Sequence, residues 1–151
     1  MKNISTVVFF TYNFPSRNDK RITQFIEKGY KVIVYSFVEK SQPQNYSIIR
    51  LGNYPRRMSY FKRLYHYSID IKREVRKFDK QTTLFYFFTL NTAVAVLFTN
   101  GIKYVYEESD MLFDRLKAGI GKSLFKNLNL KIIRNSYVTV FTCLLYTSPS
   151  P

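Results

Sequence analysis

The sequence predicts an α/β fold: a Rossmann-like three-layer sandwich with a mostly parallel sheet. Three observations carry this prediction. Short runs rich in β-branched and aromatic residues alternate with amphipathic segments along the whole chain, which is the order that produces a parallel sheet. The runs are nearly uncharged, as expected for strands buried on both faces. With 151 residues, the chain is also long enough to bury one sizeable core.

The first β-α-β unit is the clearest part of the pattern. Residues 4–12 (ISTVVFFTY) are an expected strand, and the Asn, Pro and Ser of residues 13–18 mark a loop. Asp19 is the predicted N-cap of a short helix. Gly29 is its predicted end, because glycine readily takes the positive φ of that position. Residues 31–37 (KVIVYSF) are the second expected strand, and this order predicts parallel neighbours.

The rest of the chain continues the alternation. Further strands are expected at residues 46–51, 82–88, 103–106 and 137–142, and helices at about 58–78, 92–98 and 111–135. Ligands bind at the carboxyl ends of the strands in sheets of this kind. The loops at residues 13–18, 37–44, 89–91 and 107–110 are therefore the expected places for a site. The apolar face of the long second helix is predicted to comprise Phe61, Leu64, Ser68, Ile71, Val75 and Phe78.

The charge balance is strongly basic. Lys and Arg number 24 against 10 Asp and Glu, a formal net charge of +14, so anionic lipid, nucleic acid and phosphorylated ligands are all attracted to the chain. The charge is spread along the sequence without a recognisable base-reading motif, so nucleic acid is the least favoured partner. The single Cys143 fits a reducing cytoplasm, and no apolar run is long enough to cross a bilayer. We expect a cytoplasmic protein, peripheral at the inner face of the plasma membrane if it meets a membrane.

The first loop and helix carry the most informative pattern. Asp19, Arg21 and Ile22 form an Asp-x-Arg-Ile step after a Pro-containing loop, and Gly29 and Val32 follow at the spacing of a helix and a strand. This pattern resembles the opening of the family 4 glycosyltransferases, which have the two-domain GT-B fold, and the strand and helix order agrees to about residue 142. Many members carry a Gly-rich first loop, but residues 12–20 contain no Gly here. The alternative for Asp19 and Arg21 is a helix cap with a solvated neighbour.

The resemblance implies a bacterial enzyme of surface polysaccharide synthesis. Such an enzyme moves a sugar from a nucleotide-sugar donor to a glycan or lipid-linked acceptor, with retention of configuration and without a metal or other cofactor. Residues 1–142 would be the N-terminal, acceptor-side domain. The family holds the donor mainly through a C-terminal domain that this chain lacks, so we expect no activity from the chain alone. Residues 143–151 (CLLYTSPSP) resemble a translated sequencing adapter and are expected to be a non-native tail; the alternative is a genuine strand end followed by a Ser-Pro turn. The implied cleft-lining residues are Asn13, Phe14, Pro15, Asp19, Arg21, Glu107, Glu108 and Asp110.

Three of these residues form an acidic turn after the fifth expected strand. Glu107, Glu108 and Asp110 lie where this fold places its chemistry, and carboxylates there can hold sugar hydroxyls or act as a general base. The alternative is a capping run that the dipole of the next helix favours. His66 is the only His, and no Cys or second His accompanies it, so no metal site is expected. No residue is assigned a catalytic role from the sequence.

The second helix region is basic and aromatic. Cations interspersed with tyrosines suit docking on anionic lipid, whereas the alternative is an amphipathic helix with its charges in solvent. This pattern keeps a second hypothesis open: a non-enzymatic basic α/β module that binds an anionic membrane or nucleic acid. The residues expected to dock on a membrane are Arg56, Arg57, Lys62, Arg63, Arg76 and Lys77.

Overall fold

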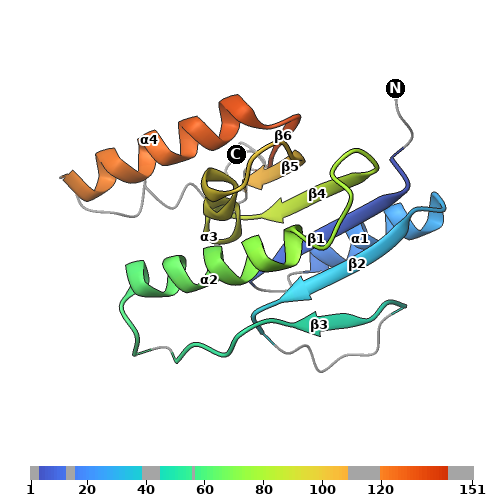
Figure 1. The fold of residues 1–151 in the computed structure, drawn as a ribbon, viewed down its shortest axis with the longest axis horizontal. Helices are drawn as coiled ribbons and strands as arrows, with labels where there is room; N and C mark the ends of the chain where they lie inside the picture. Colours follow the sequence, from blue (N-terminus) through green and yellow to red (C-terminus); the bar gives the residue numbers. More distant parts are fainter. Residues whose placement is uncertain (1–3, 13–15, 39–44, 56, 109–119, 143–151) are drawn as a thin grey trace, which may run out of the picture.

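The computed structural model describes residues 4–12, 16–38, 45–55, 57–108 and 120–142. They form one six-stranded sheet in the order β3-β2-β1-β4-β5-β6 (Figure 1), and every neighbouring pair is parallel. This is the strand order of doubly wound Rossmann-like sheets. The predicted fold class is therefore confirmed.

The elements follow the expected alternation. The strands are β1 (Thr6–Thr11), β2 (Lys31–Ser36), β3 (Ile48–Arg50), β4 (Thr83–Phe88), β5 (Lys103–Glu108) and β6 (Val138–Phe141). The helices are α1 (Ser16–Glu27), α2 (Tyr60–Val75), the short α3 (Leu90–Ala93), the 3-10 helix η1 (Val94–Phe98) and α4 (Ile120–Asn135).

The helices form two unequal layers. Figure 1 shows α2, α3 and α4 in front of the sheet and α1 behind it. Successive residues of a strand point to opposite faces, so Val8 and Phe10 of β1 enter the core under α2–α4, whereas Val7 and Phe9 enter the core under α1. Both cores are rich in aromatic rings; Phe10 stacks between Tyr35 and Phe87 at centroid distances of 5.3 and 5.2 Å.

The predicted end of the first helix is confirmed. Gly29 has φ +83°, its N–H donates to the carbonyl of Ile26, and the N–H of Tyr30 donates to the carbonyl of Phe25. These two bonds define a Schellman motif. The Phe25 and Tyr30 rings also meet at 5.6 Å, which supplies the hydrophobic contact that usually accompanies the motif.

Other local predictions need correction. α1 begins at Ser16, so Asp19 lies in its first turn and is not the N-cap. β5 continues through Glu107 and Glu108, which were expected in a turn. Phe61, expected on the buried face of α2, is 59% exposed. The single helix expected at 92–98 is α3 followed by a 3-10 turn.

Candidate functional site

The candidate site lies where β1 and β4 end. The two strands are paired side by side, and the chain leaves β1 for α1 on one face and β4 for α3 on the other (Figure 1). Open α/β sheets bind ligands at such a topological switch point. Asn13, Phe14 and Pro15, which were predicted to line the site, lie outside the described residues.

Polar contacts fix the walls of the switch point. The side-chain amide of Asn18 donates to Oγ1 of Thr11 at 3.1 Å, and both residues are buried. This bond ties the first turns of α1 to the end of β1. Across the switch point, the N–H of Thr89 donates to the carbonyl of Glu107 at 2.9 Å, which ties the end of β4 to the end of β5.

Thr89 has an unusual backbone. Its φ is +72°, a value that a β-branched residue adopts only under strong constraint. Its hydroxyl oxygen is buried and has no hydrogen-bond partner among the described residues. Strain of this kind persists only where the surrounding structure over-determines it, and it collects at ligand sites. Thr89 is therefore a site candidate that the sequence analysis did not name.

Glu107 anchors a buried polar network on the α1 face. Its carboxylate is 2% exposed, accepts a hydrogen bond from the hydroxyl of Tyr86, and lies 3.5 Å from Nε of Arg21. Burial and the bond to Glu107 raise the pKa of Tyr86 above its ordinary value, so this hydroxyl stays a donor at neutral pH. Two predicted site residues, Arg21 and Glu107, are thus in contact.

A pocket of about 300 Å³ lies beside this network. Arg21 and Phe25 of α1 form one wall and Tyr86 of β4 contributes to the floor. Nε of Arg21 is buried without a hydrogen-bond partner. The remaining apolar lining is Val105, Val138 and Val140, so the pocket joins an apolar floor to a small polar end, the usual composition of a small-molecule site.

Glu108 points to the opposite face. Its carboxylate is 3% exposed and accepts a hydrogen bond from the hydroxyl of Tyr106. Nearby, the hydroxyl of Tyr60 donates to Oδ1 of Asn91 at 2.5 Å. Burial is the main cause that raises the pKa of Tyr60, and the negative charge of Glu108 adds to it. Glu107 and Glu108 therefore belong to separate networks on the two sides of the sheet.

The remaining predicted site residues lie elsewhere. Asp19 is half-buried and accepts a hydrogen bond from the hydroxyl of Tyr46, just before β3. This bond joins α1 to the segment before β3. Asp110 lies outside the described residues. Tyr86, which the sequence analysis missed, stands in an apolar strand run where nothing local marks a polar partner.

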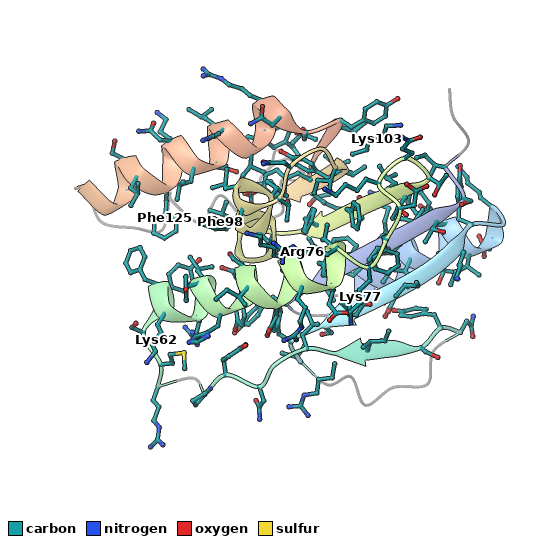
Figure 2. All side chains as sticks on the ribbon, in the orientation of Figure 1. Lys62, Arg76, Lys77, Phe98, Lys103 and Phe125 are labelled. Carbon is teal, nitrogen blue, oxygen red and sulfur yellow. The ribbon has the colours of Figure 1, made fainter. Side chains whose placement is uncertain are left out.

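The predicted membrane-docking residues that the structure describes lie in α2 and in the residues just before and after it. Arg57 and Lys62 are exposed and Arg63 is half-buried. At the other end of the helix Arg76 is exposed, whereas Nζ of Lys77 is 2.7 Å from the carboxylate of Glu74. Figure 2 shows Lys62 near the start of α2 and Arg76 and Lys77 near its end. Arg56 lies outside the described residues.

Comparison with known proteins gives no match to a family model, a curated protein or a solved structure. In the part of the chain that the structure describes, no three His, Cys, Asp or Glu side chains gather as they would around a metal ion. No helix of that part has both the length and the apolar character needed to cross a membrane.

Proposed function

We propose that residues 1–142 form the acceptor-side domain of an enzyme that moves a sugar from a nucleotide-sugar donor to a glycan or lipid-linked acceptor. One observation carries the proposal: Arg21 and Glu107 meet in a buried network beside a pocket, next to the switch point of the sheet. These residues come from the two segments whose sequence resembles the family, the Asp-x-Arg-Ile step and the acidic end of the fifth strand.

The network suits recognition of a sugar. A hydroxyl-rich ligand needs donors and acceptors held in fixed positions, and buried charged groups supply them at little reorganisation cost. Glu107 offers carboxylate lone pairs, and Arg21, whose side chain lines the pocket and is 35% exposed, offers further guanidinium N–H donors. The donor would be held by the second domain that the resemblance implies.

The binding half of this proposal can be tested on the chain itself. We would titrate isotope-labelled protein with small saccharides and record the amide shifts of Thr89, Glu107 and Arg21 by NMR. Saturable shifts at these positions, weakened in Glu107→Gln and retained in Glu27→Gln, are the expected result. Glu27 is an exposed acid at the end of α1 and serves as the matched control. Shifts that are absent, or equal in both variants, would contradict the site.

Testing the transfer reaction itself first requires the coding sequence downstream of codon 142. A long read of the source DNA across codon 142 would show whether the frame continues into a second β/α domain. If it does, glycosyl transfer should be assayed on the completed protein with nucleotide sugars, and Glu107→Gln should lower transfer. If the frame stops, the transferase proposal is wrong.

A second candidate function is docking on an anionic membrane, and the outer face of α2 favours it. Phe61, Tyr65 and Ile69 are 59, 61 and 44% exposed at four-residue spacing, and the exposed cations Lys62 and Arg76 lie on the same helix. Apolar rings beside cations suit the membrane interface. Phe61→Ser with Tyr65→Ser should reduce sedimentation with phosphatidylglycerol vesicles, whereas Leu124→Ser with Leu130→Ser on α4 should not.

A further inference from the structure

A second polar pocket lies away from the switch point. It has a volume of about 250 Å³ and sits between the end of α2 and the end of η1, close to the residues that precede β4 and β5. These are the amino ends of the strands, whereas the candidate site lies at the carboxyl ends. Lys72, Arg76, Lys80, Phe98 and Asn100 are among its lining residues, and we call it the amino-edge pocket.

The charges of α2 are sorted between its two flanks. The acids Asp70 and Glu74 are buried. Asp70 forms an ion pair with Arg73 at 3.3 Å and accepts a hydrogen bond from the hydroxyl of Tyr54. Glu74 forms an ion pair with Lys77 at 2.7 Å. These two acidic side chains are therefore already paired, on the side of α2 that faces β2 and the segment after β3.

The other flank carries cations without acids. Among the described residues, neither Lys72 nor Arg76 has a carboxylate partner, and none of the residues that line the amino-edge pocket is acidic. Nζ of Lys80 is held in place by the carbonyl of Asn100 at 2.7 Å, which still leaves donors for a ligand. Lys72, Arg76 and Lys80 all line this pocket, so three positive charges surround the same hollow.

Three like charges around one hollow repel one another, and an anion of high charge removes that repulsion. A phosphate monoester carries a charge of about −1.5 to −2 at pH 7 and three strong acceptor oxygens. Lys and Arg donors bind such a group through short, charge-assisted hydrogen bonds. The composition of the pocket therefore fits phosphate better than a single carboxylate.

Phe98 adds an apolar platform to the cationic pocket. Its side chain is 53% exposed, so the ring is open to a ligand in the pocket. Figure 2 shows Phe98 and Arg76 near one another where η1 meets α2, and both line the pocket. A ring or acyl group attached to the phosphate could cover Phe98 while the phosphate meets the cations.

We propose that the amino-edge pocket binds a phosphate monoester, with the phosphate held by Lys72, Arg76 and Lys80 and the apolar part of the ligand on Phe98. The inference does not rest on sugar transfer, because it uses none of the residues at the switch point. The phosphate could belong to a small ester or to a lipid headgroup, since both present the same chemistry to these side chains.

The test is a titration of the chain with phenyl phosphate and, separately, with inorganic phosphate, followed by NMR at the amides of Phe98, Thr99 and Asn100. Saturable shifts with tighter binding of phenyl phosphate are expected. Lys72→Gln with Arg76→Gln should weaken both probes about tenfold, because two ion contacts are lost. Phe98→Ala should abolish the preference for phenyl phosphate and leave inorganic phosphate unchanged.

The control removes the same number of charges from another helix. Lys126→Gln with Arg134→Gln on α4 lowers the net charge equally but leaves the pocket intact, because neither residue lines it. Shifts that do not saturate, or that weaken equally in both double variants, would show a general charge effect and overturn the proposal. Urea unfolding of each variant identifies any loss of fold, and Phe98→Ala provides a second test without a change of charge.

Competition with lipid vesicles distinguishes a lipid headgroup from a small phosphate ester as the ligand. Vesicles of phosphatidic acid in phosphatidylcholine should displace phenyl phosphate if the pocket takes lipid headgroups, and the displacement should depend on Lys72 and Arg76. Failure of the vesicles to compete, with phenyl phosphate still bound through the same residues, assigns the pocket to a small ester. Both results support the phosphate site.

Discussion

The contact between Arg21 and Glu107 makes a quantitative prediction about stability. Glu107 is almost fully buried, and its carboxylate has two described polar neighbours, the hydroxyl of Tyr86 and Nε of Arg21. Glu107→Gln keeps the shape but removes the charge, so it weakens one charge-assisted hydrogen bond and abolishes the ion pair. We expect a loss of about 2–3 kcal/mol in the free energy of unfolding.

Arg21→Met tests the other partner. Methionine keeps much of the aliphatic stem that packs beside Phe25. The arginine side chain is 35% exposed and its Nε is 3.5 Å from the carboxylate, so solvent screens the pair and the expected loss is about 1 kcal/mol. In the Glu107→Gln background the charge is already absent, and Arg21→Met should then cost almost nothing.

Urea unfolding of the four proteins, followed by circular dichroism, measures this double-mutant cycle. The expected coupling energy is about 1 kcal/mol, equal to the screened ion pair. If the double variant loses as much free energy of unfolding as the two single variants together, the side chains of Arg21 and Glu107 are not coupled. Arg21 then does not stabilise the buried carboxylate. The m-values of all four proteins should agree, since the cycle compares stabilities only if the unfolding transition is unchanged.

Three further predictions concern the scaffold. Gly29→Ala should cost about 1 kcal/mol in urea unfolding, because φ is +83° while no atom lies within 4 Å of the added methyl, so only backbone strain opposes it; a neutral effect would refute the strain. Ile71→Ala, at a fully buried position, should cost about 3 kcal/mol, and a loss below about 1 kcal/mol would contradict the packing under α2. For Glu74, burial alone would raise the pKa, but hydrogen bonds from Lys77 and Tyr35 outweigh it and lower the pKa below 4.5. The stability difference between wild type and Glu74→Gln should therefore be at its maximum above pH 4.5 and shrink as the pH falls through the folded pKa of Glu74. A difference that grows as the pH falls would show that folding raises this pKa instead of lowering it.

The sequence predicted those features that depend on neighbours along the chain. The buried strands follow from their uninterrupted apolar runs, and the end of α1 follows from one glycine that needs a positive φ. Strand order is different, because pairing of β1 with β4 joins segments more than 70 residues apart. The parallel class could be predicted from alternation, but the position of the switch point required the structure.

The site was only partly predictable for the same reason. The loops at the carboxyl ends could be named in advance, since topology places them there. The role of Tyr86 could not, because its polar partner is 21 residues away. The positive φ of Thr89 is disfavoured for a β-branched residue, so conformational propensities would not predict it at this position. Phe61 was misplaced because helical spacing marks a face but not its edges, and this ring lies outside the buried part of α2.

The two carboxylates at the end of β5 provide the sharpest test of which face of the sheet holds the proposed acceptor. Glu107 and Glu108 are adjacent in a strand, so they point to opposite faces and cannot act on one ligand as a pair. Glu107 contacts Arg21, which lines the α1-side pocket, whereas Glu108 meets Tyr106 in the layer beneath α2–α4. Glu107→Gln should therefore weaken saccharide binding far more than Glu108→Gln, although both remove a buried charge and both should lower stability. If Glu108→Gln weakens binding more in a titration of folded protein, the acceptor lies on the α2 face, and the assignment of Arg21 and Glu107 to its site is wrong.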